Sequence, residues 1–395
     1  MKTVKLSSLC NILSGFAFKS ELFGEDGLPI VRIRDVVRGY SETYYSGDYD
    51  EKYILDDGDI LVGMDGDFNT AYWNGGRALL NQRVCKIEVD STKACKKFIY
   101  YFLPLELKKI WDETPFVTVK HLSAKKIVDI DVPDWPLETQ KKIAAVLEKA
   151  DQLRKDCQQM EQELNSLSQS VFIEMFGDPV TNPKGWKVAT LSTIVDDFLG
   201  GKSLVAADDK NTEFTNRVLK ISAVTSGEFK PKESKPLPND YIPQADHFIS
   251  AGDLLFSRAN TTELVGATTM VFDEYTGLVL PDKLWRFIWK DKSSLSPIFI
   301  WRQLCEAAVR KEISKLSSGS GGSMKNISKG KLKTLPVVLP PLKLQKKFEL
   351  IYMNLREQIG CNKQQLILSE QAFSSLMQKA FNGELQLVNA KTNKM

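Results

Sequence analysis

The chain has 395 residues, of which 43% are hydrophobic and 26% are charged, and its net charge is +3. This length predicts two or more domains, and the composition is that of a globular protein. No apolar run approaches the ~20 residues of a membrane span, and the N-terminus lacks the apolar segment of a signal peptide, so we expect a cytoplasmic protein without a membrane partner.

Metal-binding residues are sparse. The six cysteines include no C-x-x-C pair and there are two histidines, so we expect no metal site and interpret the cysteines as reduced, buried thiols. Charge is dispersed as well, because the first 180 residues are slightly acidic and the rest are slightly basic. A nucleic-acid-binding function would therefore depend on local clusters of cations.

The chain begins with a globular segment, residues 1–135, and contains a second one at residues 187–339. In the first segment, runs of β-forming residues bounded by turn residues predict strands at 29–37, 60–64 and 80–89, and apolar periodicity predicts a helix at 94–111. In the second segment, the same signals predict strands at 217–224, 253–257, 268–272 and 284–290 and a helix at 297–316. The fold class is therefore predicted to be α+β.

A long helix is predicted between the two segments, at residues 136–177. Pro136 suits its first turn, and Gly177 followed by Pro179 suits its end. Apolar side chains recur between them at alternating spacings of three and four residues, which is the heptad pattern of a coiled coil. These are Ile143, Val146, Ala150, Leu153, Cys157, Met160, Leu164, Leu167 and Val171. Forty helical residues would extend ~60 Å, and residues 178–186 form a turn-rich linker.

A second long helix is predicted at residues 340–383, before a polar tail at 384–395. Its apolar stripe is Phe348, Tyr352, Leu355, Ile359, Leu366, Phe373, Leu376 and Ala380. Asn362 and Ser369 interrupt the stripe, and a polar residue on such a seam lowers stability but can fix pairing and register. A slightly frayed, exposed helix is the alternative. If the two helices pair antiparallel, the predicted seam consists of Ile143, Ala150, Cys157, Leu164 and Val171 with Phe348, Leu355, Asn362 and Leu376.

The sequence is duplicated. The octapeptide at 136–143 returns at 341–348, and the offset of 205 residues is constant from Lys120 onward. Within the globular segments the offset is smaller, 185 near Leu6 and 194 near Asp57, as expected where loops accept insertions. Two copies of a globular segment followed by a long helix predict a pseudo-two-fold internal repeat.

Catalytic motifs are absent. Gly200-Gly201-Lys202-Ser203 is not a phosphate-binding loop, because Asp196 stands where its first glycine is required. An adenine methyltransferase would need an Asn/Asp-Pro-Pro-aromatic tetrad, but Asn182-Pro183 is followed by Lys184. The chain is therefore interpreted as non-catalytic. Two related but different globular segments on two long helices suit the recognition of two different DNA half-sites, separated by a helical turn of ~34 Å or more.

The order of short motifs resembles that of the specificity subunits of type I restriction–modification enzymes. The motifs are Leu6-Ser7-Ser8-Leu9, Gly58-Asp59-Ile60-Leu61, Phe176-Gly177-Asp178-Pro179, Gly252-Asp253-Leu254-Leu255, Asn326-Ile327-Ser328, and Leu339-Pro340-Pro341-Leu342 with Gln345. The resemblance covers nearly the whole chain. In one departure, Asp134-Trp135-Pro136 precedes the first long helix where Leu339-Pro340-Pro341 precedes the second.

The resemblance implies two α/β target-recognition domains separated by two antiparallel coiled-coil spacer helices. It implies a subunit that recognises a bipartite, asymmetric target in double-stranded DNA. The implied partners are two modification (methyltransferase) subunits and then restriction subunits. Those partners would use S-adenosylmethionine, ATP and Mg²⁺, whereas this chain would hold no cofactor.

Charge and loop position suggest the DNA contacts, since Arg and Lys suit phosphate and guanine and Asn suits adenine. In the first segment the predicted contacts are Lys19, Arg32, Arg34, Arg38, Arg77, Arg83, Lys120 and His121. In the second they are Lys202, Arg217, Lys220, Arg258, Lys283, Arg286, Lys325, Asn326 and Lys329. For each of them a solvated surface side chain is the alternative. For the whole chain, a coiled-coil scaffold or adaptor that binds protein partners is the alternative function, and a self-sufficient methyltransferase is disfavoured by the missing tetrad.

Overall fold

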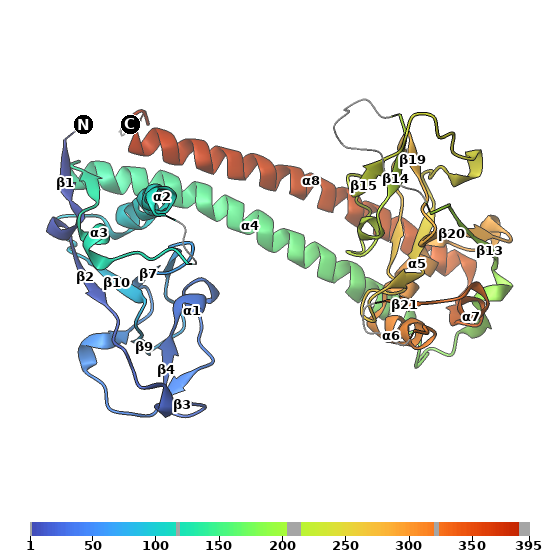
Figure 1. Ribbon diagram of the computed structural model, residues 1–395, viewed down its shortest axis with the longest axis horizontal. Helices are drawn as coiled ribbons and strands as arrows, with labels where there is room; N and C mark the ends of the chain where they lie inside the picture. Colours follow the sequence, from blue (N-terminus) through green and yellow to red (C-terminus); the bar gives the residue numbers. More distant parts are fainter. Residues whose placement is uncertain (1, 116–118, 204–214, 320–323, 387–395) are drawn as a thin grey trace, which may run out of the picture. The chain divides into compact units, whose positions relative to one another are not determined.

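The computed structural model describes residues 2–115, 119–203, 215–319 and 324–386. The chain forms two compact units that both mix helices with sheets. The first unit consists of Met1–Gln159 and Lys363–Met395, and the second of Met160–Asn362. Helix α4 (Leu137–Phe176) and helix α8 (Leu342–Phe381) therefore each contribute one part to each unit (Figure 1). No helix among the described residues has the length and apolar character needed to cross a membrane.

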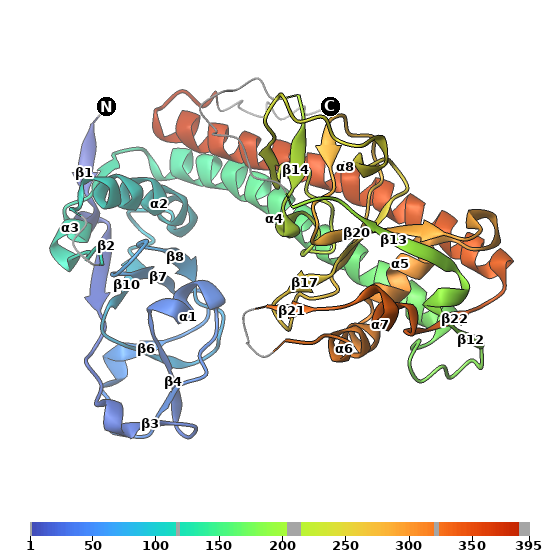
Figure 2. The ribbon, with the colours of Figure 1, turned by 45° about the vertical axis from the view of Figure 1, so that its right-hand side comes forward.

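The first unit is built around a four-stranded antiparallel sheet (Figure 2). Its strand order is β2 (Cys10–Ser14), β10 (Val84–Val89), β7 (Ile60–Gly63) and β8 (Thr70–Tyr72). A second sheet contains β3 (Phe23–Gly24), β5 (Tyr44–Tyr45), β4 (Leu28–Val31), β9 (Ala78–Leu80) and β6 (Ile54–Leu55), in that order. The remaining elements are the pair β1 (Thr3–Lys5) with β11 (Asp131–Pro133) and helices α1 (Ile33–Arg38), α2 (Lys96–Glu113) and α3 (Ala124–Val128).

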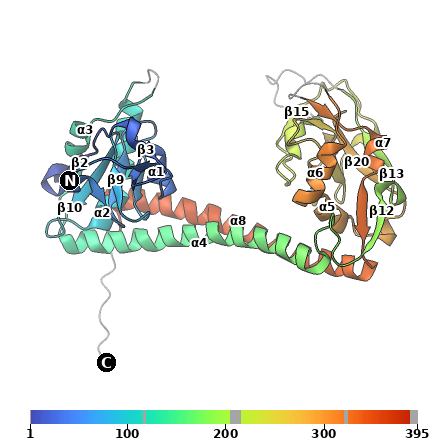
Figure 3. The same ribbon diagram turned by 90° about the horizontal axis from the view of Figure 1, so that it is seen from below.

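The second unit (Figure 3) contains a four-stranded antiparallel sheet, and its strand order corresponds to that of the sheet in the first unit. The order is β13 (Val195–Gly200), β20 (Leu284–Trp289), β16 (Leu254–Ser257) and β18 (Thr268–Met270). Smaller sheets are β15 (Ser234–Pro236), β14 (Arg217–Leu219) and β19 (Leu278–Val279); β12 (Lys187–Thr190) with β22 (Pro336–Leu339); and β17 (Ala259–Asn260) with β21 (Lys325–Asn326). Its helices are α5 (Pro297–Cys305), α6 (Ala307–Lys315) and α7 (Lys329–Lys333).

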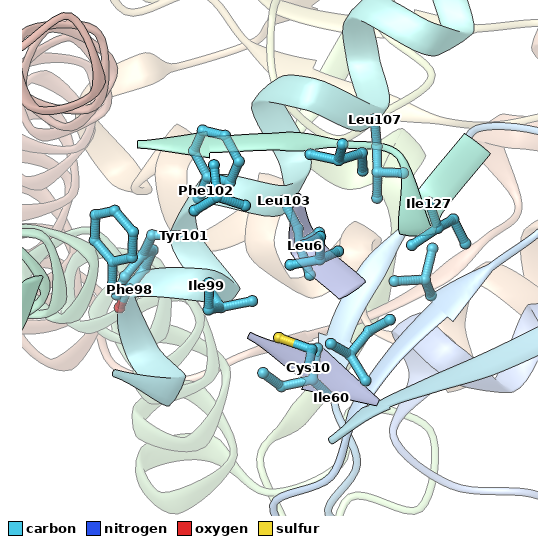
Figure 4. Close-up of a cluster of buried hydrophobic side chains, with 14 of the residues drawn as sticks. Leu6, Cys10, Ile60, Phe98, Ile99, Tyr101, Phe102, Leu103, Leu107 and Ile127 are labelled. Carbon is cyan, nitrogen blue, oxygen red and sulfur yellow. The ribbon is translucent and has the colours of Figure 1, made fainter. Parts of the chain in front are cut away.

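The core of the first unit lies between its four-stranded sheet and the helices. Helix α2 buries Phe98, Ile99 and Leu103 against strand residues such as Ile60 (Figure 4). The early turns of α4 and the last turns of α8 complete this core with the buried clusters Ile143, Ala144, Leu147, Met377 and Ala380. Burying Ile143, Leu147 and Met377 contributes roughly 1.5–3 kcal/mol each, so these two helix ends are held by the hydrophobic effect.

The core of the second unit has an aromatic centre. Phe172 and Phe176, from the end of α4, pack on Phe348 from the start of α8, with ring centroids 5.4 and 5.6 Å from that ring. Phe299 of α5 packs on Phe176 with a centroid separation of 4.6 Å. All four side chains are at most 1% exposed. The end of α4 and the start of α8 are therefore part of this globular core.

The repeated octapeptide contains a glutamine that attaches each long helix to its unit. The side-chain oxygen of Gln140 accepts a hydrogen bond from the Cys95 amide (2.9 Å), and its nitrogen donates to the Trp135 carbonyl (2.9 Å). The side chain of Gln345 does the same with Ser296 (3.0 Å) and Pro340 (2.8 Å). Both glutamines are at most 3% exposed, so they satisfy buried backbone groups that would otherwise lack partners.

A buried cation supports the sheet of each unit. Lys86 is 9% exposed and lies 3.5 Å from Asp59 and 2.9 Å from Glu88. Burial alone would lower the pKa of the Lys86 ammonium, but the two carboxylates outweigh it and raise the pKa above its usual value. In the second unit Arg286 lies 3.1 Å from Asp253, with 13% of its side chain exposed.

A bulge explains where the sequence offset changes. Strand β13 shifts its register on β20 between Val195 and Asp197, and this one-residue insertion increases the offset from 185 to 186. Gly201 is then equivalent to Gly15, and both lie against a neighbouring backbone. A Cβ atom at Gly15 would be 2.1 Å from the Asn81 oxygen, and one at Gly201 would be 1.7 Å from the Leu280 oxygen. Only glycine fits either position.

Three secondary-structure predictions are wrong, and one of them is the strand at 217–224, which is strand β14 (Arg217–Leu219) followed by a 3-10 helix at Ile221–Ala223. The segment predicted as a strand at 29–37 is strand β4 followed by helix α1, because the Asp35 side chain accepts a hydrogen bond from the Arg32 amide (2.9 Å) and caps a short helix. The segment predicted as one helix at 297–316 is the pair α5 and α6, because Glu306 has extended backbone angles and breaks the helix. The prediction of buried cysteines also fails in part, since Cys361 is exposed and Cys95 and Cys305 are only half-buried.

The apolar seam of α4 is rotated from the predicted one. Ile143 and Cys157 are buried and Ala150, Leu164 and Val171 are half-buried, but the positions three residues further on are exposed. Those positions are Val146 (38%), Leu153 (51%), Met160 (47%) and Leu167 (46%). The positions four residues after Ile143 and Leu164 face inward instead, since Leu147 belongs to the core of the first unit and Ser168 is 6% exposed. The positions three and four residues after a given helix residue lie on opposite sides of it. The prediction therefore placed the buried stripe of α4 on the wrong side of these residues.

The stripe of α8 is buried or half-buried along its length. Phe348, Leu355, Asn362, Ser369 and Ala380 are buried, and Tyr352, Ile359, Leu366, Phe373 and Leu376 are half-buried. Helix α8 is continuous from Leu342 to Phe381.

Candidate nucleic-acid interface

Three loops of the first unit meet beyond one end of the four-stranded sheet. The Met64 amide, just after β7, donates to the carbonyl of Arg83, just before β10 (2.8 Å). The Leu122 amide, from the loop before α3, donates to the Met64 carbonyl (2.7 Å). Residues separated by up to 58 positions in sequence are thereby joined through the backbone, and the predicted contacts Arg83 and His121 lie together.

An acidic residue lies between these two side chains. The Asp65 carboxylate is 2.7 Å from Nδ1 of His121 and 3.7 Å from Nε of Arg83. The Asp65 side chain is 17% exposed, whereas those of Arg83 and His121 are 56% and 60% exposed. Arg83 has a φ of 70°, in the left-handed region that residues other than glycine rarely adopt. The side chains of Arg83 and His121 therefore face solvent, whereas the Asp65 carboxylate between them is largely covered.

The neighbouring Lys120 has a structural position. It is 8% exposed, its ammonium donates to the Trp111 carbonyl (2.5 Å), and the same ammonium lies 3.5 Å from the centre of the Trp111 ring. The Trp111 indole in turn donates to the Gly66 carbonyl (2.8 Å). Because its ammonium is already paired and buried, Lys120 is a poor candidate for a DNA contact, contrary to the prediction.

The second unit has the same junction with different side chains. The Arg258 amide donates to the Lys283 carbonyl (3.1 Å), and the Ile327 amide donates to the Arg258 carbonyl (2.9 Å). Strands β17 and β21 place Ala259 opposite Asn326. The structure therefore brings together four predicted contacts, which are Arg258, Lys283, Lys325 and Asn326.

Two of these residues have defined side-chain partners. Nε of Arg258 donates to the Asp282 carbonyl (2.7 Å), and Nζ of Lys325 donates to the Gly319 carbonyl (2.7 Å). Lys202 forms an isolated β-bridge with Pro281, next to this junction. The Lys202 side chain is exposed. The junction thus carries several cations, and the carboxylate equivalent to Asp65 is replaced by Ala259.

Comparison with known proteins shows what the chain is similar to. Residues 1–166 match a family model described as the type I restriction modification DNA specificity domain. The chain is 35% identical over 280 residues to the type I restriction enzyme EcoBI specificity subunit of Escherichia coli, across 60% of this chain and 59% of that protein. It is 23% identical to the MjaVIII specificity subunit of Methanocaldococcus jannaschii, across 91% of this chain and 90% of the relative. The chain is thus similar to specificity subunits of type I restriction enzymes, and residues 1–166 carry the match to the family model.

A solved structure has the same fold. The S subunit of the type I restriction–modification system of M. genitalium superposes with a TM-score of 0.60 at 14% sequence identity, across 96% of each chain. At this identity the likeness concerns the fold. The matching region spans somewhat more than half the length of the EcoBI relative, so activity and partners are considered separately below.

Several predicted contacts in the second unit are engaged elsewhere. Arg286 donates to the carbonyls of Phe248 (2.9 Å) and Asp246 (2.6 Å) and pairs with Asp253. It is the counterpart of the buried Lys86, and its assignment as a DNA contact is not supported. The other engaged side chains are Arg217, bonded to Ser234 (3.1 Å), Lys220, 3.8 Å from Glu233, and Lys329, 2.8 Å from Asp197.

The remaining predicted contacts of the first unit lie around α1 and on neighbouring loops. Arg32, Arg34 and Arg38 are exposed at or within this helix, and Lys19 is exposed on a loop. Arg34 lies 3.6 Å from Asp35 and Arg38 lies 3.8 Å from Glu42. Arg77 pairs with Glu51 (2.9 Å). These are surface ion pairs, which cost little to exchange for phosphate contacts.

Two residues at the first junction escaped the sequence analysis. Asp65 was missed because an acidic residue does not stand out among candidate DNA contacts. Phe16 is 48% exposed and accepts a backbone hydrogen bond from Gln82 (2.8 Å), beside Arg83. Aligning Gly15 with Gly201 could have identified Phe16, because this alignment makes Phe16 the counterpart of the predicted contact Lys202. No cluster of metal-ligating side chains exists within the described part of the chain.

Proposed function

We propose that this chain is the DNA-recognition subunit of a type I restriction–modification enzyme and is itself non-catalytic. The observation that carries this proposal is the junction of three loops that occurs once in each unit. Both junctions have the same backbone hydrogen bonds, but they carry different polar and charged side chains. Side chains that differ on a common backbone suit two different half-sites in double-stranded DNA.

The two units are proposed to be copies of one target-recognition domain in a pseudo-two-fold repeat. Support comes from the common strand order, the paired glutamines Gln140 and Gln345, and the paired cations Lys86 and Arg286. Helices α4 and α8 are proposed to be antiparallel coiled-coil spacers that set the distance between half-sites. Their buried stripes with heptad spacing support this role.

The catalytic steps are proposed to belong to partner subunits. Two modification subunits would transfer the methyl group from S-adenosylmethionine, and restriction subunits would use ATP and Mg²⁺. Exposed apolar residues on α4, including Leu153 and Leu167, offer surface for protein partners. A DNA partner also implies a cytoplasmic location.

Co-expression with the modification subunit, followed by mapping of methylated adenines in the host DNA, tests this function. We expect methylation within a motif of two fixed blocks separated by a spacer of constant length. Methylation without sequence preference, or none while the complex assembles, would refute the proposal. Specific methylation by the isolated chain would show instead that it is an enzyme.

A further inference from the structure

We propose that Arg83 recognises a guanine in the half-site bound by the first unit, and that Asp65 and His121 position its side chain. This inference rests on the proposed function, because it names the base-contacting residue within the same interface. It is carried by the geometry around Asp65, which has no counterpart in the second unit.

The backbone at Arg83 is fixed in an uncommon conformation. Its carbonyl accepts the Met64 amide, and the Val84 amide that follows donates to the Asn81 carbonyl (3.2 Å). Its φ of 70° is one of three positive values at residues other than glycine in the described chain. A non-glycine residue in this region persists where the surroundings enforce it, and such residues concentrate at functional sites.

The side chain of Arg83 is orientated from one side. The Asp65 carboxylate lies 3.7 Å from Nε, and its other oxygen contacts His121 at 2.7 Å. Among the described residues no hydrogen bond to the terminal Nη atoms of Arg83 is formed, and 56% of the side chain is exposed. An arginine fork supported at Nε presents two parallel donors, which match O6 and N7 of guanine in the major groove.

The position of Asp65 argues against a simple phosphate-binding role. A carboxylate near the DNA backbone repels phosphate, so it weakens a purely electrostatic contact. A carboxylate that fixes the orientation of an arginine is useful only where direction matters, as in a bidentate contact with a base. His121, which contacts the same carboxylate at 2.7 Å, holds Asp65 in place.

The second unit lacks this arrangement. Ala259 stands at the position of Asp65, Asn326 at that of His121, and Lys283 at that of Arg83. A lysine is a flexible point charge and does not form the two parallel donors of a guanidinium. The other arginine at that junction, Arg258, has its terminal Nη2 3.7 Å from the Asp282 carboxylate, so the guanine contact is inferred for Arg83 of the first unit.

The test uses the full chain in complex with its modification subunit and DNA sites selected from a random library. Arg83→Lys retains the charge but removes the fork. We expect it to reduce the preference for guanine at one position of one half-site by about ten- to a hundredfold, with all other positions unchanged. Arg83→Gly, which suits the backbone conformation, should lose the same preference. Asp65→Asn should lose part of it.

Lys93 provides the matched control. It lies beyond the other end of strand β10 and pairs with Asp90 (3.0 Å), so Lys93→Gln removes one positive charge away from the junction. We expect this variant to keep every base preference. If Arg83→Lys keeps the guanine preference, or weakens binding equally at all sequences, Arg83 is not a base contact and the inference is overturned. A wild-type complex without any sequence preference would instead overturn the proposed function as well.

Discussion

Replacing Gln345 by alanine should destabilise the second unit by about 2–4 kcal/mol. The Gln345 side chain is 3% exposed and bonds both the Ser296 amide (3.0 Å) and the Pro340 carbonyl (2.8 Å). Alanine cannot replace either bond, and Ser296 is fully buried, so water does not easily take their place. A buried backbone group left unpaired costs roughly 1–3 kcal/mol, and two such groups at about 1–2 kcal/mol each, the lower part of that range, give the stated value.

Thermal unfolding of the full chain, followed by near-UV circular dichroism, measures this effect. For a unit of about 200 residues, each kcal/mol lowers Tm by roughly 2–4 °C, so a decrease of about 5–15 °C is expected. Gln358 is exposed on the same helix within the same unit, and Gln358→Ala should change Tm by no more than about 2 °C. Equal small shifts in both variants would refute the structural role assigned to the repeated glutamine.

Three further predictions concern packing and pH. Gly201→Ala should lower the free energy of unfolding, measured in urea, by more than about 2 kcal/mol, because the new Cβ would lie 1.7 Å from the Leu280 carbonyl oxygen. Gly360→Ala, on the open face of α8, should be neutral or stabilising. Similar effects at both sites would argue against the close approach of Gly201 to Leu280. Leu147→Ala should lower the free energy of unfolding by about 2–5 kcal/mol, because Leu147 is buried. Leu153→Gln should lower it by less than about 0.5 kcal/mol, because Leu153 is exposed. The reverse order would support the buried side of α4 that was predicted from the sequence. Burial raises the pKa of the Glu306 carboxyl, although Arg302 at 3.6 Å opposes this. The folded state therefore binds the proton more tightly, and stability increases as pH falls through the raised pKa toward the ordinary glutamate value. Glu306→Gln should remove this dependence and be more stable than the wild type at pH 8, and parallel pH profiles of the two proteins would count against it.

The long helices were the most predictable part of the fold. Helices α4 and α8 lie within one or two residues of the ranges predicted at 136–177 and 340–383, because forty residues of regular spacing leave no competing structure. The side of α4 that is buried was not predictable from the spacing. That choice depends on Leu147 and Phe172, which join cores made mainly by other parts of the chain.

The candidate site was only partly predictable. A lysine or arginine has the same appearance in a sequence whether it faces solvent or a buried carboxylate. Arg286 pairs with Asp253 and Lys120 lies on Trp111, and neither partner is adjacent in sequence. Conversely, the contribution of Asp65 becomes visible only when two distant loops bring Arg83 and His121 to the same carboxylate.

The central claim is that two units with different side chains recognise two different DNA half-sites. The most direct measurement is selection of bound sites from random double-stranded DNA by the complex with the modification subunit, in parallel for the wild type, Arg83→Lys and Lys283→Met. We predict two separated blocks of fixed bases, one altered only by the change at Arg83 and the other only by the change at Lys283. A single contiguous block, or changes in both blocks from either substitution, would contradict the account.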